Sequence, residues 1–229
     1  MIRIERSGLL LRHAPGWLQD RGISTQSLRH ALAADLAWQQ PLVTVYGKQH
    51  PTPRLTCWVA DPGCSYRYSG LEQQIHPWTA ALNQLRNLLE QHLEVRFNSL
   101  LLNRYRDGAD RMGWHADDEP ELNPEAPIAS LSLGAARDLR FRPRDGQEAS
   151  FALNLADGDL LVMDPPSQRH WQHALPPRAR VMAERINLTF RVIQPRTAMQ
   201  SISTRAPLGR AATSTQARAG ETPAPNTSA

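Results

Sequence analysis

The chain changes its hydrophobic period near residue 94, and this change limits the folds open to it. Before that point, residues 24–39 and 77–93 place leucines at helical spacing. After it, apolar and polar residues alternate in short runs that turn-forming sequences separate. These runs are 95–105, 127–134, 138–144, 149–155, 158–164, 170–176 and 185–193. Two helices followed by seven short strands favour an α+β fold, a sandwich or jelly roll with helices supporting one face.

Length and composition predict one folded domain with a tail. A chain of 229 residues can bury one sizeable core but not two large ones. Residues 196–229 contain no aromatic side chain and are mostly Ala, Thr, Ser, Pro and Gly. They bury too little apolar surface to offset the entropy of ordering, so we expect a disordered tail. The domain then covers 1–195, with the helices in 1–94 and the β core in 95–195.

The net charge of +4 says little about nucleic-acid binding, because most of it belongs to the tail. Residues 196–229 hold four arginines and one glutamate, whereas residues 1–195 hold 22 basic and 21 acidic side chains. A binding footprint should be a basic patch on the folded part. No apolar run is long enough to cross a bilayer, and the N-terminus is a poor signal peptide. We therefore expect a cytoplasmic, monomeric protein without a membrane partner.

His115 and Asp117, two residues apart, are the first candidate metal ligands. On an extended segment such residues point to the same face. A third ligand should come from a distant strand, and residues 169–176 offer His170 and His173. Two histidines and one carboxylate cover one face of an octahedral ion and leave three positions open, as in non-haem Fe(II) oxygenases. A metal-dependent hydrolase could use the same three ligands.

The segment Arg185–Arg191 predicts a strand with one polar and one apolar face. Its polar residues are Arg185, Asn187, Thr189 and Arg191, and its apolar residues are Ile186, Leu188 and Phe190. Oxygenases of this kind commonly use 2-oxoglutarate, whose free carboxylate needs a cation, best a bidentate arginine. The polar face therefore predicts a co-substrate site, for which a hydrolase has no use. The structural alternative is the polar outer face of an edge strand.

Five segments together resemble the AlkB family of iron- and 2-oxoglutarate-dependent nucleic-acid dealkylases. They are Asn103–Gly108, His115–Glu119, 127–142, His170–Pro176 and Arg185–Arg191, in the family's order. Pro53-Arg54 and Tyr66–Gly70 resemble the family's nucleotide-recognition lid, nearest to its duplex-DNA repair branch. The resemblance implies a double-stranded β-helix (jelly roll) with supporting N-terminal helices and this lid within residues 1–94.

The resemblance also implies the iron ligands. His115, Asp117 and His173 would hold Fe(II), with His170 as the rival third ligand. Strand alternation puts His170 on the face opposite His173, and the following Ala-Leu-Pro favours His173. These three ligands and Arg191 are the expected catalytic residues.

The co-substrate contacts follow from the same resemblance. Arg185 would pair with the distal carboxylate of 2-oxoglutarate, helped by Asn103 and Tyr105. Asn187 and Arg191 would hold its chelating end.

Substrate contacts are expected in the lid and just after the first two ligands. Arg54 and Tyr66 belong to the lid, and Tyr68 matches the aromatic residue that stacks on the flipped base. Asp118 and Glu119 would read the polar edge of the base. The structural alternatives are a core tyrosine for Tyr68 and a solvated acidic loop for the two carboxylates.

Tyr46 is a further expected substrate contact. Residues 41–48 predict a short strand that runs into a turn at Gly47. An aromatic side chain at such a tip could fill the gap that a flipped base leaves in the duplex. Its alternative is a packed or simply exposed side chain.

The function that the resemblance implies is DNA repair. With Fe(II), 2-oxoglutarate and O₂, the enzyme would oxidise the N-methyl group of 1-methyladenine or 3-methylcytosine. The products would be formaldehyde, succinate, CO₂ and the unmodified base. One alternative is a demethylase or hydroxylase of RNA, for instance tRNA. Another is a catalytically inactive nucleic-acid-binding jelly roll, although such a protein would not need the ligands and both arginines.

Overall fold

The computed structural model describes residues 1–45, 47–64, 67–68, 71–72 and 75–194. The predicted substrate contacts Tyr46 and Tyr66 and the predicted tail, 196–229, lie outside these residues. No helix in the described part is long and apolar enough to span a membrane.

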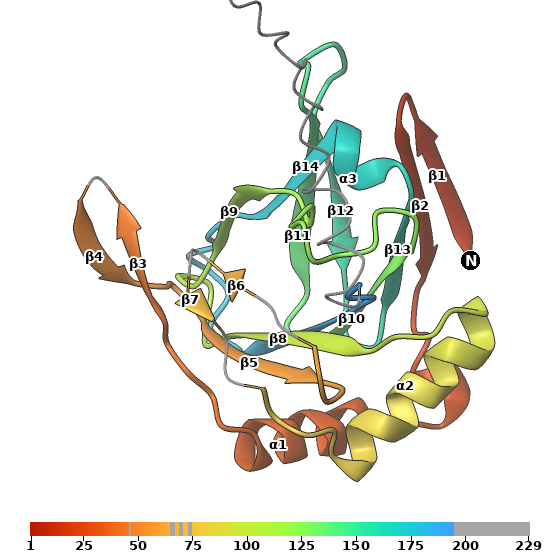
Figure 1. Cartoon of the computed structure of the whole chain (residues 1–229), viewed down its shortest axis with the longest axis vertical. Helices are drawn as coiled ribbons and strands as arrows, with labels where there is room; N and C mark the ends of the chain where they lie inside the picture. The colour runs from red at the N-terminus through yellow and green to blue at the C-terminus, as the bar shows by residue number, and fades with distance from the viewer. Residues whose placement is uncertain (46, 65–66, 69–70, 73–74, 195–229) are drawn as a thin grey trace, which may run out of the picture. The chain divides into compact units, whose positions relative to one another are not determined.

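Two antiparallel sheets face each other and form the body of residues 1–194 (Figure 1). The larger sheet runs in the order β1 (Ile2–Arg6), β2 (Leu9–Ala14), β13 (Leu160–Asp164), β10 (Ile128–Gly134), β15 (Arg185–Arg191), β8 (Ser99–Tyr105) and β5 (Leu55–Ala60). The smaller runs β12 (Phe151–Leu155), β11 (Arg137–Pro143), β14 (Trp171–Leu175) and β9 (Met112–His115). This arrangement confirms the predicted α+β jelly roll.

Two hairpins stand apart from these sheets. β3 (Leu42–Val45) pairs with β4 (Lys48–Pro51), and β6 (Arg67–Tyr68) pairs with β7 (Leu71–Glu72). Gly47 follows the first strand with a φ of 76°, a left-handed conformation that favours glycine in a turn. The predicted strand and turn of residues 41–48 are thus present.

Two helices cover the outer face of the larger sheet (Figure 1). They are α1 (Thr25–Asp35) and α2 (Ala80–Leu93); the shorter helices are η1 (Gln19–Arg21) and α3 (Ser167–His170). The predicted leucine stripe of α2 is buried against the sheet: Leu82, Leu85, Leu89 and Leu93.

Both long helices are shorter than the sequence predicts, for local reasons. The Thr79 hydroxyl accepts the N–H of Leu82, so α2 begins three residues after Pro77. At the end of α1, the Trp38 indole donates to the carbonyl of Leu32, which takes the place of a further helical turn. The backbone is already extended at Leu36.

The seven predicted strands are all present, as β8 and β10 to β15, and four further strands complete the sheets. β1, β2 and β5 belong to the larger sheet and β9 to the smaller. Residues 1–94 therefore supply three of the larger sheet's seven strands. The last difference is α3, which occupies residues 167–170 so that β14 begins only at Trp171.

Apolar and polar side chains alternate along β15, so that one face of the strand is apolar and the other is polar. Ile186, Leu188 and Phe190 are fully buried on the helix side of the larger sheet. The residues between them point into the space between the two sheets, where a pocket lies. A second apolar cluster also packs between the two sheets. It includes Leu11 of the larger sheet and Phe141 and Trp171 of the smaller sheet.

We expect Leu89→Ala to destabilise the protein by roughly 2–5 kcal/mol, because it removes a buried side chain and leaves a cavity between α2 and the sheet. Urea unfolding followed by circular dichroism measures the change. Gln91→Ala, on the exposed face of the same helix, is the control and should change stability by less than about 0.5 kcal/mol. Equal effects of the two substitutions would contradict the packing described for α2.

Candidate active site

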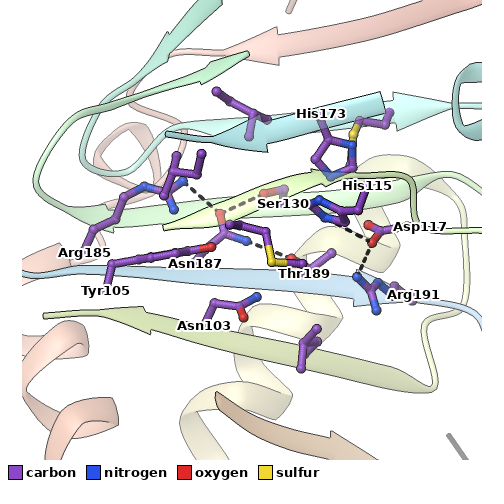
Figure 2. A pocket seen from close by; sticks show the side chains of 15 residues that line it. Asn103, Tyr105, His115, Asp117, Ser130, His173, Arg185, Asn187, Thr189 and Arg191 are labelled. Atoms are coloured by element: carbon purple, nitrogen blue, oxygen red, sulfur yellow. Dashed lines mark hydrogen bonds and ion pairs between the residues drawn. The ribbon is translucent and has the colours of Figure 1, made fainter. Parts of the chain in front are cut away.

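A pocket between the two sheets collects most of the predicted functional residues (Figure 2). About 500 Å³ of it, including its mouth, is free of protein atoms. Its lining comes from both sheets and comprises Leu101, Asn103, Tyr105, Met112, His115, Asp117, Ser130, Leu139, Met163, His173, Leu175, Arg185, Asn187, Thr189 and Arg191. Figure 2 shows Arg185 and Tyr105 at one end of this pocket and the histidines with Asp117 and Arg191 at the other.

His115, Asp117 and His173 form a group that could hold a metal ion. One potential ligand atom from each lies within 4.8 Å of the other two. β9 and β14 place His115 directly opposite His173, and their ring centroids are 4.2 Å apart. Asp117 follows in the loop after β9. His170 is exposed at the end of α3 and is not part of the group, so the predicted strand alternation between His170 and His173 does not apply.

The charge state of this group suits a divalent cation. Burial alone would raise the pKa of Asp117, but the charge of Arg191, with smaller contributions from the neighbouring His173 and His115, lowers it to about 2. Burial, together with the charge of His115, lowers the pKa of His173 to about 3. At neutral pH, Asp117 is therefore a carboxylate and His173 a neutral imidazole. Both are in the form that binds metal without first losing a proton.

Arg191 holds the carboxylate of Asp117. Its Nη2 atom donates to Oδ1 of Asp117 at 2.6 Å, and both side chains are almost fully buried. A charge-assisted bond of this kind fixes the carboxylate within the pocket. It also explains how two opposite charges persist in an interior site, because each offsets the cost of burying the other.

Arg185 is buried without such a partner at the opposite end. It is 2% exposed, and among the described residues no carboxylate lies within ion-pair distance of it. Its Nη2 donates to Ser132 and Asn187, both at 2.9 Å, whereas its Nε has no acceptor in the part of the chain that the structure describes. Burial lowers its pKa to about 10, so it stays charged at neutral pH. A buried cation facing a pocket fits an anionic ligand.

Polar residues between the two ends are ordered by a continuous set of hydrogen bonds. The Ser130 hydroxyl donates to Oδ1 of Asn187 at 3.0 Å, and Nδ2 of Asn187 donates to Thr189 at 2.8 Å. Across the β8–β15 pairing, Asn103 lies opposite Asn187 and Tyr105 opposite Arg185. The pocket thus offers a buried cation, amides and a phenol along one path.

Sequence reasoning missed the contribution of β10. Ser130 and Ser132 are buried hydroxyls that bond Asn187 and Arg185. The two serines are two residues apart in an otherwise apolar strand, so they point to the same face, and this pattern in the sequence could have identified them.

Arg54 is buried, whereas a lid residue that contacts the substrate from outside should be exposed. It is 3% exposed, and its Nε donates to Oδ1 of Asn103 at 2.8 Å. The structure therefore places it behind one of the predicted co-substrate residues.

The other predicted substrate residues lie at the rim or cannot be placed. Asp118 is exposed and forms an ion pair with Arg144, and Glu119 is half-buried. The backbone of Tyr68 is part of β6, but its side chain lies outside the described residues, as do Tyr46 and Tyr66.

Comparison with protein families and curated proteins adds independent information. The family described as the 2OG-Fe(II) oxygenase superfamily matches residues 10–191. The chain is 45% identical over 160 residues to DNA oxidative demethylase ALKBH2 of Mus musculus, which covers 67% of each protein. It is 44% identical over 158 residues to ALKBH2 of Homo sapiens, covering 66% of this chain and 60% of that protein.

A second group of relatives is more distant. Alpha-ketoglutarate-dependent dioxygenase alkB homolog 3 of Mus musculus is 36% identical over 173 residues, which cover 72% of this chain and 60% of that protein. The matches thus span between 60% and 67% of the length of these curated relatives.

Two solved structures share the fold. The structure of OsALKBH1 matches with a TM-score of 0.54 at 17% identity, over 82% of this chain and 99% of that one. An oxidoreductase of the 2OG-Fe(II) oxygenase family from Burkholderia pseudomallei matches with a TM-score of 0.50 at 16% identity, over 79% and 84%. The matched residues 10–191 include the pocket and every strand of the two sheets except β1 and the first residue of β2, so the chain belongs to the 2OG-Fe(II) oxygenase superfamily and, within it, to the AlkB family.

Proposed function

We propose that this protein is a DNA repair dioxygenase that removes methyl groups from N-alkylated bases such as 1-methyladenine and 3-methylcytosine. One observation carries the chemistry: a His-Asp-His group faces the same pocket as a buried arginine that has no carboxylate partner among the described residues. The relatives named DNA oxidative demethylase ALKBH2 support DNA as the substrate. Family membership implies Fe(II), 2-oxoglutarate and O₂ as the cofactor and co-substrates.

In this proposal, His115, Asp117 and His173 hold the iron. When bound, the iron with 2-oxoglutarate and O₂ supplies the oxidising power, yielding succinate and CO₂ and releasing the methyl group as formaldehyde. The protein's own part is to bring two imidazoles and one carboxylate together, with Asp117 ionised and His173 neutral at neutral pH. Arg191 keeps the carboxylate in place through its bond to Oδ1 of Asp117.

The co-substrate lies along β15 in the proposal. Arg185 pairs with the distal carboxylate of 2-oxoglutarate, and Tyr105 and Asn103 line the same end. Asn187 and Arg191 contact the chelating end. The bonds of Ser132 and Asn187 to Arg185 orient the guanidinium before the ligand arrives, which reduces the entropy lost on binding.

The target base must leave the stack, because a methylated ring nitrogen is enclosed within a duplex. Tyr46, Tyr66 and Tyr68 are the proposed aromatic contacts of the flipped base and the duplex. Asp118 and Glu119 are the proposed readers of the polar edge of the base. For Asp118, reading a base requires it to exchange or share its bond to Arg144.

Arg54 is retained as a proposed substrate contact with a restriction that its burial imposes. Because only 3% of its surface is exposed and its Nε donates to Asn103, Arg54 would act on the base mainly through Asn103, which lines the pocket.

The proposal also covers the chain's organisation. Residues 1–195 form one domain and 196–229 a disordered tail; the compact unit Met1–Arg196 supports this boundary. A monomer and a cytoplasmic location complete the proposal. Sedimentation of the full chain and fractionation of the source cells test these two points.

The test of the function is mass spectrometry of methylated oligonucleotides with and without Fe(II) and 2-oxoglutarate. Matched DNA and RNA strands carry the same lesion, and succinate is measured in parallel. Demethylated DNA with equimolar succinate supports the proposal. Faster demethylation of the RNA strand than of the DNA strand would indicate that RNA is the substrate. Binding of the oligonucleotide without formation of succinate would indicate an inactive nucleic-acid-binding protein. Substrate hydrolysis without succinate would indicate a metal-dependent hydrolase.

We expect His115→Ala, Asp117→Ala and His173→Ala each to abolish formaldehyde release while circular dichroism shows a folded protein. Each substitution removes one of three metal donors, and two donors hold the ion poorly. His170→Ala is the matched control and should keep most of the activity, because His170 is exposed outside the group. An inactive His170→Ala with an active His173→Ala would show that the ligand assignment is wrong.

We expect Arg185→Leu to weaken 2-oxoglutarate binding by about tenfold to more than a hundredfold, because hydrogen bonds to charged groups contribute roughly 1.5–3 kcal/mol. Isothermal titration of 2-oxoglutarate into the Mn(II)-loaded protein measures the affinity. Arg180→Leu, which alters an exposed arginine, controls for the general loss of positive charge and should bind normally. An unchanged titration curve for Arg185→Leu would remove this residue from the co-substrate site.

A further inference from the structure

Asp117 lies in a loop, yet its backbone is held by a side chain from a distant helix. β9 ends at His115, so Asp117 has left the sheet when it reaches the pocket. Its backbone N–H donates to Oε1 of Gln168 at 2.9 Å, across 51 positions of sequence. Its carboxylate accepts a bond from Arg191 at 2.6 Å. The residue is thus fixed at both its main chain and its side chain.

Gln168 is itself firmly anchored. Its neighbour Ser167 is buried, and the Ser167 hydroxyl both accepts from the N–H of Leu10 and donates to the carbonyl of Leu10 on β2. The Nε2 atom of Gln168 lies 3.3 Å from the sulfur of Met163, a buried residue that lines the pocket. The short helix α3 therefore presents the amide oxygen of Gln168 from a fixed position on the larger sheet.

A third contact joins this anchor to the loop from outside. Nη2 of Arg144 donates to the backbone carbonyl of Gln168 at 3.1 Å and also pairs with the carboxylate of Asp118. Two consecutive residues of the loop, Asp117 and Asp118, are therefore connected to the same glutamine, one directly and one through an arginine.

We propose that Gln168 is a positioning residue that sets the metal affinity of the site by fixing the backbone of Asp117. The inference rests on the proposed function, in which Asp117 is an iron ligand. Without the glutamine oxygen, the N–H of a residue only 5% exposed loses its acceptor. The loop would then rotate to satisfy that N–H, and the carboxylate would leave its place opposite the two histidines. Groups that orient metal ligands in this way typically change metal affinity by about tenfold to a hundredfold.

Two substitutions separate this role from packing. Gln168→Met keeps a side chain of similar length against Met163 but has no oxygen to accept the N–H of Asp117. Gln168→Glu keeps an oxygen acceptor at the same position. Arg169→Ala changes the next residue of α3, an exposed side chain that forms a surface ion pair with Glu125, and serves as the control.

The experiment titrates Mn(II) into the full-length apoprotein and follows free Mn(II) by electron paramagnetic resonance, with thermal unfolding of each apoprotein in parallel. We expect Gln168→Met to weaken Mn(II) binding by about tenfold to a hundredfold. Gln168→Glu and Arg169→Ala should bind close to the wild type. All four apoproteins should unfold at similar temperatures.

The possible failures are distinct. If the wild type binds Mn(II) and Gln168→Met binds it equally well, the inference is wrong and the proposed function stands. If Gln168→Glu loses as much affinity as Gln168→Met, or if the loss follows a lower unfolding temperature, Gln168 acts through the fold and not as an acceptor. A wild type that binds no Mn(II) overturns both the inference and the proposed metal site.

Discussion

The burial of two arginines on one central strand is the constraint on which the site depends. β15 lies between β10 and β8, with the helices on one side and the smaller sheet on the other. Its apolar side chains fill the layer under α1 and α2, so Arg185 and Arg191 have to face the interior on the opposite side. Burying a cation is costly unless a counter-charge or hydrogen bonds compensate it. The residues around the two arginines supply this compensation: Asp117 pairs with Arg191, and Ser132 and Asn187 accept hydrogen bonds from Arg185.

The two arginines are compensated differently, and the difference divides the pocket. Arg191 has Asp117 as a counter-ion within the protein, so that end is close to neutral before any ligand binds. Arg185 has no carboxylate partner among the described residues; it donates to Ser132 and Asn187, and its guanidinium lies 5.7 Å from the centre of the Tyr105 ring. One end therefore suits a metal, whose charge the carboxylate can share, and the other attracts an anion. A dicarboxylate that also chelates the metal satisfies both ends at once.

Features that depend on neighbouring residues could be predicted from the sequence, whereas features that depend on residues far apart in the chain could not. The leucine stripe of α2 and the alternation of β15 are local patterns, and each is visible in a few neighbouring residues. β5 was not predicted because its run, Leu55–Ala60, is nearly continuous in apolar residues, and such runs fit a helix as well as a strand. Its identity as a strand comes from pairing with β8, about 45 positions later in sequence.

In the pocket, too, contacts within one short segment were predictable from the sequence, and contacts between distant segments were not. The proximity of the proposed ligands His115 and Asp117 was predictable because both residues belong to one short segment. The positions of Arg54 behind Asn103 and of Gln168 behind Asp117 were not, since each bond joins segments about 50 positions apart. The α3 anchor also depends on β2, a strand from the first 14 residues. The N-terminal part of the chain therefore has a structural role besides the proposed substrate lid. It completes the larger sheet and, through α3, supports the loop that contains Asp117, the proposed carboxylate ligand.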